Sequence, residues 1–351
     1  MFKVKVLNQE VIKKTLGMKE VIEAVEKVYT LKAKKRADVW PMIFHEFEPG
    51  AADMDIKSGY LNDADIYGLK LVSWYGENAK KDLPPLIGTT LVFDMKTGVP
   101  IGLLSAEHIT GMRTGAAGAI GAKYLANKGA ENFLMVGTGH QASFQIAAML
   151  MVMNHIKKVR LYDPLDFENA KKLEGNIKGL LEEKFLAYYK DDEKLYHMLK
   201  EKFDVTFEAV ENLEDAVKKS NIITTATPSK KPMIMKEWVK SGTHISCVGA
   251  DMSGKQEIDE NIFSMAKVFV DDVNQAKNVG ETEMAIKKGV IQEKDILGEM
   301  GELILQNIKG RNSKEDITIY DTTGIALQDL MVSKLALDVA NENGIGEEIL
   351  L

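Results

Sequence analysis

The chain has 351 residues, of which 45% are hydrophobic and 28% are charged, a globular composition with room for two domains of about 100 to 200 residues. Its 45 Lys and Arg against 52 Asp and Glu give a formal net charge of −7, which opposes a broad electrostatic grip on nucleic acid or anionic lipid. Cys247 is the only cysteine, so an internal disulfide and a Cys-rich zinc site are excluded and the cytoplasm is the expected compartment. No apolar run has the length of a signal peptide or a membrane span, so we expect neither export by that route nor membrane insertion.

The first third of the chain predicts two short helices and then a sheet. Apolar residues recur with a helical period over residues 9–36 and the pattern breaks near Gly17. From Val39 to Leu104 the residue pattern becomes typical of β-strands, in the segments WPMIF, YGLKLVSWY, TTLVFD and VPIGLL. These segments indicate a mostly antiparallel sheet. A helix then begins near Glu107, and the Gly and Ala residues in MRTGAAGAIGAKYLA predict that another backbone or a cofactor packs closely against it.

The second half predicts a parallel, doubly wound sheet. A short apolar strand, FLMV, leads through a glycine turn into an apolar helix, and further strands follow as KVRLYDP, NIITTAT, HISCVGAD, KVFVDD and ITIYDTTG. The charged segment at 179–203 exceeds what one crossover needs, and we interpret it as a surface insertion. The last helix, ALQDLMVSKLALDVANENG, has an apolar stripe that we expect to pack on the first domain.

The glycine turn has the pattern of a dinucleotide site. Gly137, Gly139 and Ala142 form GxGxxA between a strand and a helix, where the first glycine allows the turn, the second admits a pyrophosphate and the third small residue lets the helix approach the strand. Asp163 ends the next strand, 21 residues after Ala142, close to the spacing at which an acid binds the adenosine ribose. No Arg or Lys follows it to accept a 2′-phosphate, so NAD is predicted rather than NADP.

Other candidates lie at strand ends or interrupt apolar runs. Asp251 follows HISCVGA, where capping of a helix and catalysis are about equally compatible with the spacing. Lys70 interrupts YGLKLVSW and Arg113 lies among small residues; cations so placed usually pair or snorkel, but beside a cofactor they can hold a carboxylate. His45 and His108 have no partners at metal-ligand spacing, so no metal site is predicted.

Five blocks, MRTGAAGAIGAKYLA, VGTGHQASFQ, ITTATPSK, VGADMSGK and YDTTGIALQDL, occur in an order that resembles the ornithine cyclodeaminase and mu-crystallin family along nearly the whole chain. The resemblance implies an α/β protein: a Rossmann domain at 116–324, and an N-terminal α+β domain at 1–115, completed by the C-terminal helix at 325–351, that binds substrate and forms a homodimer. It implies Lys70 on the substrate carboxylate, Arg113 near substrate and cofactor phosphates, and Asp251 as the acid/base. Beyond the turn residues and Asp163, the implied cofactor contacts are His140, Gln141, Thr227, Val248, Gly249, Ala250, Lys255 and Thr322.

The resemblance to the family is weaker in the N-terminal region that is expected to recognise the substrate. No Arg lies between Arg36 and Arg113, whereas family members commonly carry one in this region. Lys57 in MDIKSGYL is the nearest replacement cation, with an exposed turn lysine as the other interpretation. A family threonine that contacts the cofactor is replaced by Pro85, which leaves Thr89 or Thr90 to substitute.

The resemblance favours an NAD-dependent ornithine cyclodeaminase, which converts L-ornithine to L-proline and ammonia through an imine. An amino-acid dehydrogenase of the alanine type and a cyclic ketimine reductase remain as alternatives, because Asp251 would serve all three reactions. A mu-crystallin-like binding protein that uses the dinucleotide without turnover is the alternative of another class.

Overall fold

The computed structural model describes all residues, 1–351, and the chain divides into two compact units. Unit 1 comprises Met1–Arg113 and Ile325–Leu351, and unit 2 comprises Thr114–Gly324. One helix, α3 (Glu107–Leu125), runs from the first unit into the second. No helix has the length and apolar character that crossing a bilayer requires.

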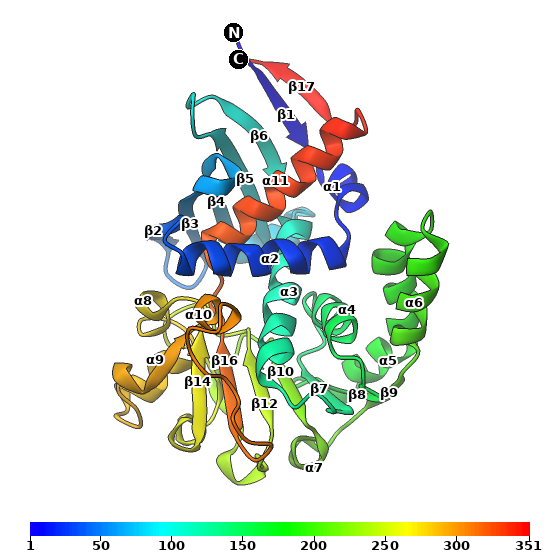
Figure 1. Cartoon of the computed structure of the whole chain (residues 1–351), viewed down its shortest axis with the longest axis vertical. Helices are drawn as coiled ribbons and strands as arrows, with labels where there is room; N and C mark the ends of the chain where they lie inside the picture. The colour runs from blue at the N-terminus through cyan, green and yellow to red at the C-terminus, as the bar shows by residue number, and fades with distance from the viewer. The chain divides into compact units, whose positions relative to one another are not determined.

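Unit 1 contains a seven-stranded sheet in the order β17-β1-β6-β5-β4-β3-β2 (Figure 1). Its strands are β1 (Lys3–Leu7), β2 (Ala37–Glu48), β3 (Ala52–Leu61), β4 (Ile66–Tyr75), β5 (Leu86–Asp94), β6 (Pro100–Ser105) and β17 (Glu347–Leu350). Only β1 and β6 pair in parallel, so the predicted, mostly antiparallel sheet is confirmed. The sequence patterns did not indicate β1, β3 or β17.

Three helices belong wholly to unit 1: α1 (Gln9–Thr15), α2 (Met18–Ala33) and α11 (Ala326–Glu342). The predicted packing of the C-terminal helix is confirmed, because α11 lies against α2, β3 and β4. Glycines on three strands make this possible: a Cβ built at Gly59, Gly68 or Gly102 would come within 3 Å of a leucine of α11. The missing side chains therefore let the helix settle on the sheet.

Unit 2 is built on an eight-stranded, fully parallel sheet in the order β15-β14-β16-β12-β10-β7-β8-β9 (Figure 1). Its strands are β7 (Asn132–Val136), β8 (Lys158–Tyr162), β9 (Thr206–Ala209), β10 (Ile222–Thr225), β12 (His244–Cys247), β14 (Ala266–Val270), β15 (Ile296–Glu299) and β16 (Ile317–Asp321), and a separate pair is formed by β11 (Lys230–Ile234) and β13 (Gln256–Ile258). Strands β10, β12 and β16 are buried throughout, as expected where a parallel sheet is covered. The predicted Rossmann-type sheet is confirmed.

The helices of unit 2 are short apart from those near the glycine turn. They are α4 (Ala142–Val152), α5 (Phe167–Leu181), α6 (Glu193–Phe203), α7 (Leu213–Lys219), α8 (Val273–Ala276), α9 (Glu281–Lys287) and α10 (Met300–Ile304). The charged insertion continues α5 as a π-helical turn at Glu182–Leu186 and then forms α6. Phe185 of this turn packs edge-on against Phe144 of α4 at 5.4 Å between ring centroids, so the insertion is attached to the first crossover helix.

Candidate functional site

The glycine turn between β7 and α4 has the geometry that its sequence predicts. Gly137 has a φ of +100°, and a Cβ there would lie 2.6 Å from the carbonyl oxygen of Ala226. A Cβ at Gly139 would meet nothing within 4 Å. The first glycine is therefore required by the backbone, whereas the second faces open space in which a ligand can approach the chain.

Three residues follow on this turn. His140 is exposed and its ring centroid lies 5.2 Å from that of Phe144. Gln141 caps α4, and its buried Oε1 has no hydrogen-bond partner in the protein. Ala142 is buried at the first turn of α4. An unpartnered buried acceptor beside open space at a helix N-terminus fits a bound ligand that supplies the missing donor.

Asp163 lies at the end of β8 and is tied down by its own loop. Its Oδ1 accepts from the backbone N–H groups of Leu165, at 3.0 Å, and Asp166, at 3.1 Å, and its Oδ2 accepts from the Thr138 hydroxyl of the glycine turn. Burial raises the pKa of Asp163, but these hydrogen bonds outweigh it and the net pKa lies below the usual 3.8. Asp163 is thus an ionised carboxylate joined directly to the glycine turn.

Thr227, Val248, Gly249 and Ala250 belong to two loops that the carboxylate of Glu257 joins. Its Oε1 accepts from the Thr227 N–H at 2.6 Å and hydroxyl at 2.8 Å, and its Oε2 accepts from the Gly249 N–H at 2.9 Å. Val248 and Ala250 are buried on either side of Gly249. Glu257 was not predicted from the sequence, because KQEIDE has the composition of an exposed charged segment.

Asp251 follows on the same loop and is exposed, with 54% of its side chain accessible. Its Oδ1 lies 2.6 Å from the Nζ of Lys255, so these two predicted site residues form an ion pair. The hydroxyl of Thr322, after β16, donates to Asp271 at 2.9 Å. Among the strand ends of unit 2, the structure therefore brings Thr227 and Gly249 together and pairs Asp251 with Lys255, while Thr322 is held by another carboxylate.

Unit 1 holds the three predicted cationic residues. Lys70 and Arg113, each at least 92% buried, both bond to Oδ1 of Asp329 on α11, Lys70 through Nζ at 3.1 Å and Arg113 through Nε at 3.2 Å. The other carboxylate oxygen of Asp329 is buried without a hydrogen-bond partner. Asp329 was not predicted from the sequence, although an acid inside the apolar stripe of ALQDLMVSKLAL is the same kind of signal that identified Lys70.

Lys57 does not lie in an exposed turn, so that interpretation is wrong. It is half-buried in β3 and stands directly opposite Lys70 of β4 in the antiparallel register. Cross-strand partners share a face of the sheet, and the charge of Lys57 reaches both Lys70 and Asp329. MDIKSGYL was mistaken for a turn because its apolar positions are sparse, whereas pairing on both sides makes it a central strand.

Burial sets the protonation of these groups. Desolvation lowers the pKa of Lys70 from 10.5 to about 8, even though the Asp329 carboxylate opposes the shift. Burial also raises the pKa of Asp329, but the charges of Arg113 and Lys70 outweigh it and hold the pKa of this carboxyl below its usual value. Unit 1 therefore contains a compact cluster in which the ionised Asp329 is the shared counter-ion of two buried cations, Lys70 and Arg113.

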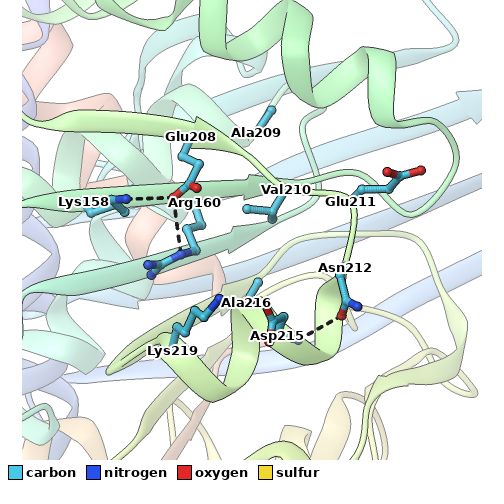
Figure 2. Close-up of a pocket in the computed structure, with 10 residues that line it drawn as sticks. All are labelled: Lys158, Arg160, Glu208, Ala209, Val210, Glu211, Asn212, Asp215, Ala216 and Lys219. Atoms are coloured by element: carbon cyan, nitrogen blue, oxygen red, sulfur yellow. Dashed lines mark hydrogen bonds and ion pairs between the residues drawn. The ribbon is translucent and has the colours of Figure 1, made fainter.

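A hollow of about 470 Å³ elsewhere in unit 2 contains none of the predicted site residues. It opens between β8, β9 and α7 (Figure 2), and Glu208 in its lining pairs with Lys158 at 3.0 Å and Arg160 at 3.6 Å. Its charges largely compensate one another, so we assign it no ligand.

The fold and the turn geometry define a protein that contains a Rossmann-type domain of the dinucleotide-binding class and a mixed-sheet unit. The model of the ornithine cyclodeaminase/mu-crystallin family matches residues 3–188 and 186–344. The chain belongs to this family.

Two named relatives align over almost the whole chain. An alanine dehydrogenase of Archaeoglobus fulgidus is 36% identical over 98% of this chain and 97% of its own length, and an iminosuccinate reductase of Paracoccus denitrificans is 32% identical over 93% of each. Among solved structures, an archaeal alanine dehydrogenase dimer with bound NAD matches with a TM-score of 0.86 at 35% identity, covering both chains fully. A Δ1-pyrroline-2-carboxylate reductase of Thermococcus litoralis, in complex with NADH and L-proline, matches with a TM-score of 0.85 at 31% identity, covering 99% of this chain and 100% of that one.

Proposed function

We propose that this protein is an NAD-dependent enzyme that transfers hydride at the α-carbon of an amino acid, acting as an amino-acid dehydrogenase or, in reverse, as an imine reductase. The observation that carries the proposal is the buried cluster in which Lys70 and Arg113 share the single carboxylate of Asp329. Two cations against one anion leave a positive charge that a substrate carboxylate would neutralise.

The residues present fit a nicotinamide dinucleotide. Open space at Gly139 suits a pyrophosphate at the N-terminus of α4, and the unpartnered Oε1 of Gln141 suits a hydroxyl group of the cofactor that donates to it. The ionised Asp163, joined to this turn by Thr138, suits the adenosine ribose hydroxyls and disfavours a 2′-phosphate. The loops that carry Thr227 and Gly249 lie at the carboxyl ends of β10 and β12, where such sheets bind their ligands.

In the proposed mechanism, Lys70 and Arg113 bind the α-carboxylate and fix the orientation of the α-carbon. Bound NAD supplies the hydride acceptor. Asp251 exchanges its partner Lys255 for the substrate ammonium and takes one proton from it, so that the nitrogen lone pair forms the C=N bond as hydride leaves the α-carbon. Water then attacks the imine, and the products are an oxo acid, ammonia and NADH.

Ornithine cyclodeamination differs only in the fate of the imine. The δ-amine of ornithine would attack the imine carbon in place of water, ammonia would leave, and the hydride would return to give proline without net reduction of NAD. Retention of Asp251 and Lys70 is compatible with this route. Identities of 32% and 36% to a reductase and a dehydrogenase support net redox chemistry as the first choice.

A homodimer is proposed from the surface of unit 1. Strand β2 is an edge of the sheet, and it exposes 40% of Trp40, 56% of Ile43, 48% of Phe44 and 55% of Phe47. Such an apolar, unpaired edge is a liability for a monomer and is suited to a protein interface. The archaeal alanine dehydrogenase structure is a dimer, which supports a dimeric state for this chain as well.

The proposal is tested by incubating the purified protein with NAD and a panel of L-amino acids that includes ornithine, while NADH, ammonia and organic products are quantified. A dehydrogenase gives NADH, ammonia and oxo acid in equal amounts, whereas a cyclodeaminase gives a cyclic amino acid and ammonia without NADH. A panel of cyclic imines with NADH tests the reverse direction. Binding of NAD without turnover on either panel would favour the mu-crystallin-like alternative and contradict the proposal.

A further inference from the structure

A single buried carboxylate joins two loops of unit 2 that carry proposed cofactor contacts. Glu257, on the short strand β13, is fully buried and accepts three hydrogen bonds: two from Thr227 after β10 and one from Gly249 after β12 (Figure 1 shows β10 and β12). Residues 227 and 249 are 22 positions apart in the chain, so this contact connects segments that the sequence separates.

The neighbourhood of Glu257 is packed so that the carboxylate has little alternative placement. A Cβ at Gly249 would lie 2.6 Å from Oε2 of Glu257 and 2.5 Å from the Thr227 nitrogen. From the other side, the carboxylate of Glu281, in the first turn of α9, accepts the N–H groups of Glu257 and Ile258. Glu257 is therefore held at its backbone N–H by the Glu281 carboxylate and at its side chain by Thr227 and Gly249.

The groups that surround Glu257 are acidic or neutral. Glu281 of α9, Asp321 of β16 and Cys247 of β12 are all fully buried and interact electrostatically within this cluster. Burial raises the pKa of Glu257 to about 7, and burial together with the Glu257 and Asp321 charges raises that of Glu281 well above its usual value. Burial likewise raises the pKa of Asp321 to about 7 and that of Cys247 well above 9. These groups therefore carry fewer negative charges at neutral pH than their ordinary pKa values would give.

The ionised and protonated forms of Glu257 differ in how many hydrogen bonds they can accept from Thr227 and Gly249. The carboxylate accepts from all three donors, whereas a protonated carboxyl adds a donor of its own and competes with Thr227 or Gly249 for the same oxygens. Loss of one of these buried bonds leaves a backbone N–H unsatisfied, which disfavours that arrangement of the loops. The joined arrangement is therefore the arrangement of the ionised form.

We propose that Glu257 is a positioning residue that couples cofactor binding to the release of a proton, because NAD selects the arrangement of loops that only the Glu257 carboxylate can hold together. The inference rests on the proposed use of NAD. By linkage, binding then tightens as pH rises through neutrality. If binding shifts the pKa of Glu257 by about one unit, NAD affinity rises about fivefold between pH 6 and pH 8, and about 0.4 proton is released per NAD bound at pH 7.

Isothermal titration calorimetry of NAD binding at pH 7, in buffers of different ionisation enthalpy, counts the protons released. We expect release by the wild type, none by Glu257→Gln, and unchanged release by His155→Asn, which changes an exposed histidine that is not among the proposed cofactor contacts. A merely structural role of Glu257 would weaken binding without changing the proton count. Release that persists in Glu257→Gln would overturn the proposal, as would no release by the wild type.

Thr227→Val provides a second variant that keeps the shape of the side chain. It removes the 2.8 Å hydroxyl bond that favours the Glu257 carboxylate, so the midpoint of the pH dependence of NAD affinity should move to higher pH. An unmoved midpoint would contradict the assignment even if Glu257→Gln does not fold. Failure of the wild type to bind NAD would refute the proposed function itself, whereas binding with no proton release that depends on Glu257 refutes this inference alone.

Discussion

Asp329→Asn removes the carboxylate charge that Lys70 and Arg113 share, and its effect can be estimated from the protonation of Lys70. Because the pKa of Lys70 is about 8 instead of its usual 10.5, keeping this side chain charged at pH 7 already costs the fold about 3 kcal/mol. Releasing the proton at pH 7 would instead cost about 5 kcal/mol. The variant therefore loses at most about 1–2 kcal/mol through Lys70, because beyond that the amine gives up its proton.

Arg113 cannot lose its charge in this way, because a guanidinium group stays protonated. The loss of its charge-assisted hydrogen bond to Asp329 adds about 1.5–3 kcal/mol to the destabilisation of the variant. We expect a total destabilisation of about 3–4 kcal/mol, measured by urea unfolding at pH 7. The KM for the amino acid should rise at least about tenfold, because the carboxylate then meets a neutral Lys70.

The pH profile distinguishes this account from general damage to the fold. In the wild type, kcat/KM should fall above about pH 8 as Lys70 loses its proton, and in Asp329→Asn this alkaline limb should move to lower pH. Asp338→Asn is the matched control on the same helix, because its pair with Lys334 at 2.6 Å is half-exposed and contributes little. An unchanged KM and an unmoved alkaline limb in Asp329→Asn would refute the shared counter-ion.

Three further predictions concern unit 2. Asp251→Asn should bind NAD nearly as the wild type does and lose turnover by several orders of magnitude, which calorimetry and steady-state assays check; equal turnover would exclude Asp251 as the proton acceptor. Asp163→Ala should weaken NAD without preventing use of NADP, so an unchanged Kd for NAD would contradict the ribose contact. Burial, with the Arg311 charge, lowers the pKa of His244 from 6.5 to about 3, so the native state binds fewer protons than the unfolded state and stability is lost as pH falls below 6.5. His244→Gln should reduce the loss between pH 7 and pH 5 by about 2 kcal/mol, and identical pH dependence in urea unfolding would exclude His244 as its source.

The parts of the fold that the sequence predicted are those with strong local signals. The apolar strands of unit 2 are short, almost fully buried and separated by helices, so each pattern is explicit and the parallel sheet follows from their alternation. Gly137 was identified for the same reason, because its positive φ is a demand of the turn itself.

The parts that the sequence did not predict depend on packing between distant segments. Strand β3 is stabilised by pairing with β2 and β4 rather than by its own composition, and Lys57 was therefore misplaced. Glu257 and Asp329 are acids whose importance arises from burial, and burial is decided by residues 30 positions away or more: Thr227 in the first case, Lys70 in the second. Acidic residues in such segments are usually solvated, so composition alone gives the opposite expectation.

The most direct test of the central claim uses amino acids that carry deuterium at the α-carbon. The protein is incubated with NAD and the deuterated panel, and the reduced cofactor is analysed by mass spectrometry alongside ammonia. The account predicts deuterated NADH and an equal amount of ammonia with at least one amino acid, and neither with Asp251→Asn. NAD that binds the wild type but acquires no deuterium from any amino acid would contradict hydride transfer from the α-carbon.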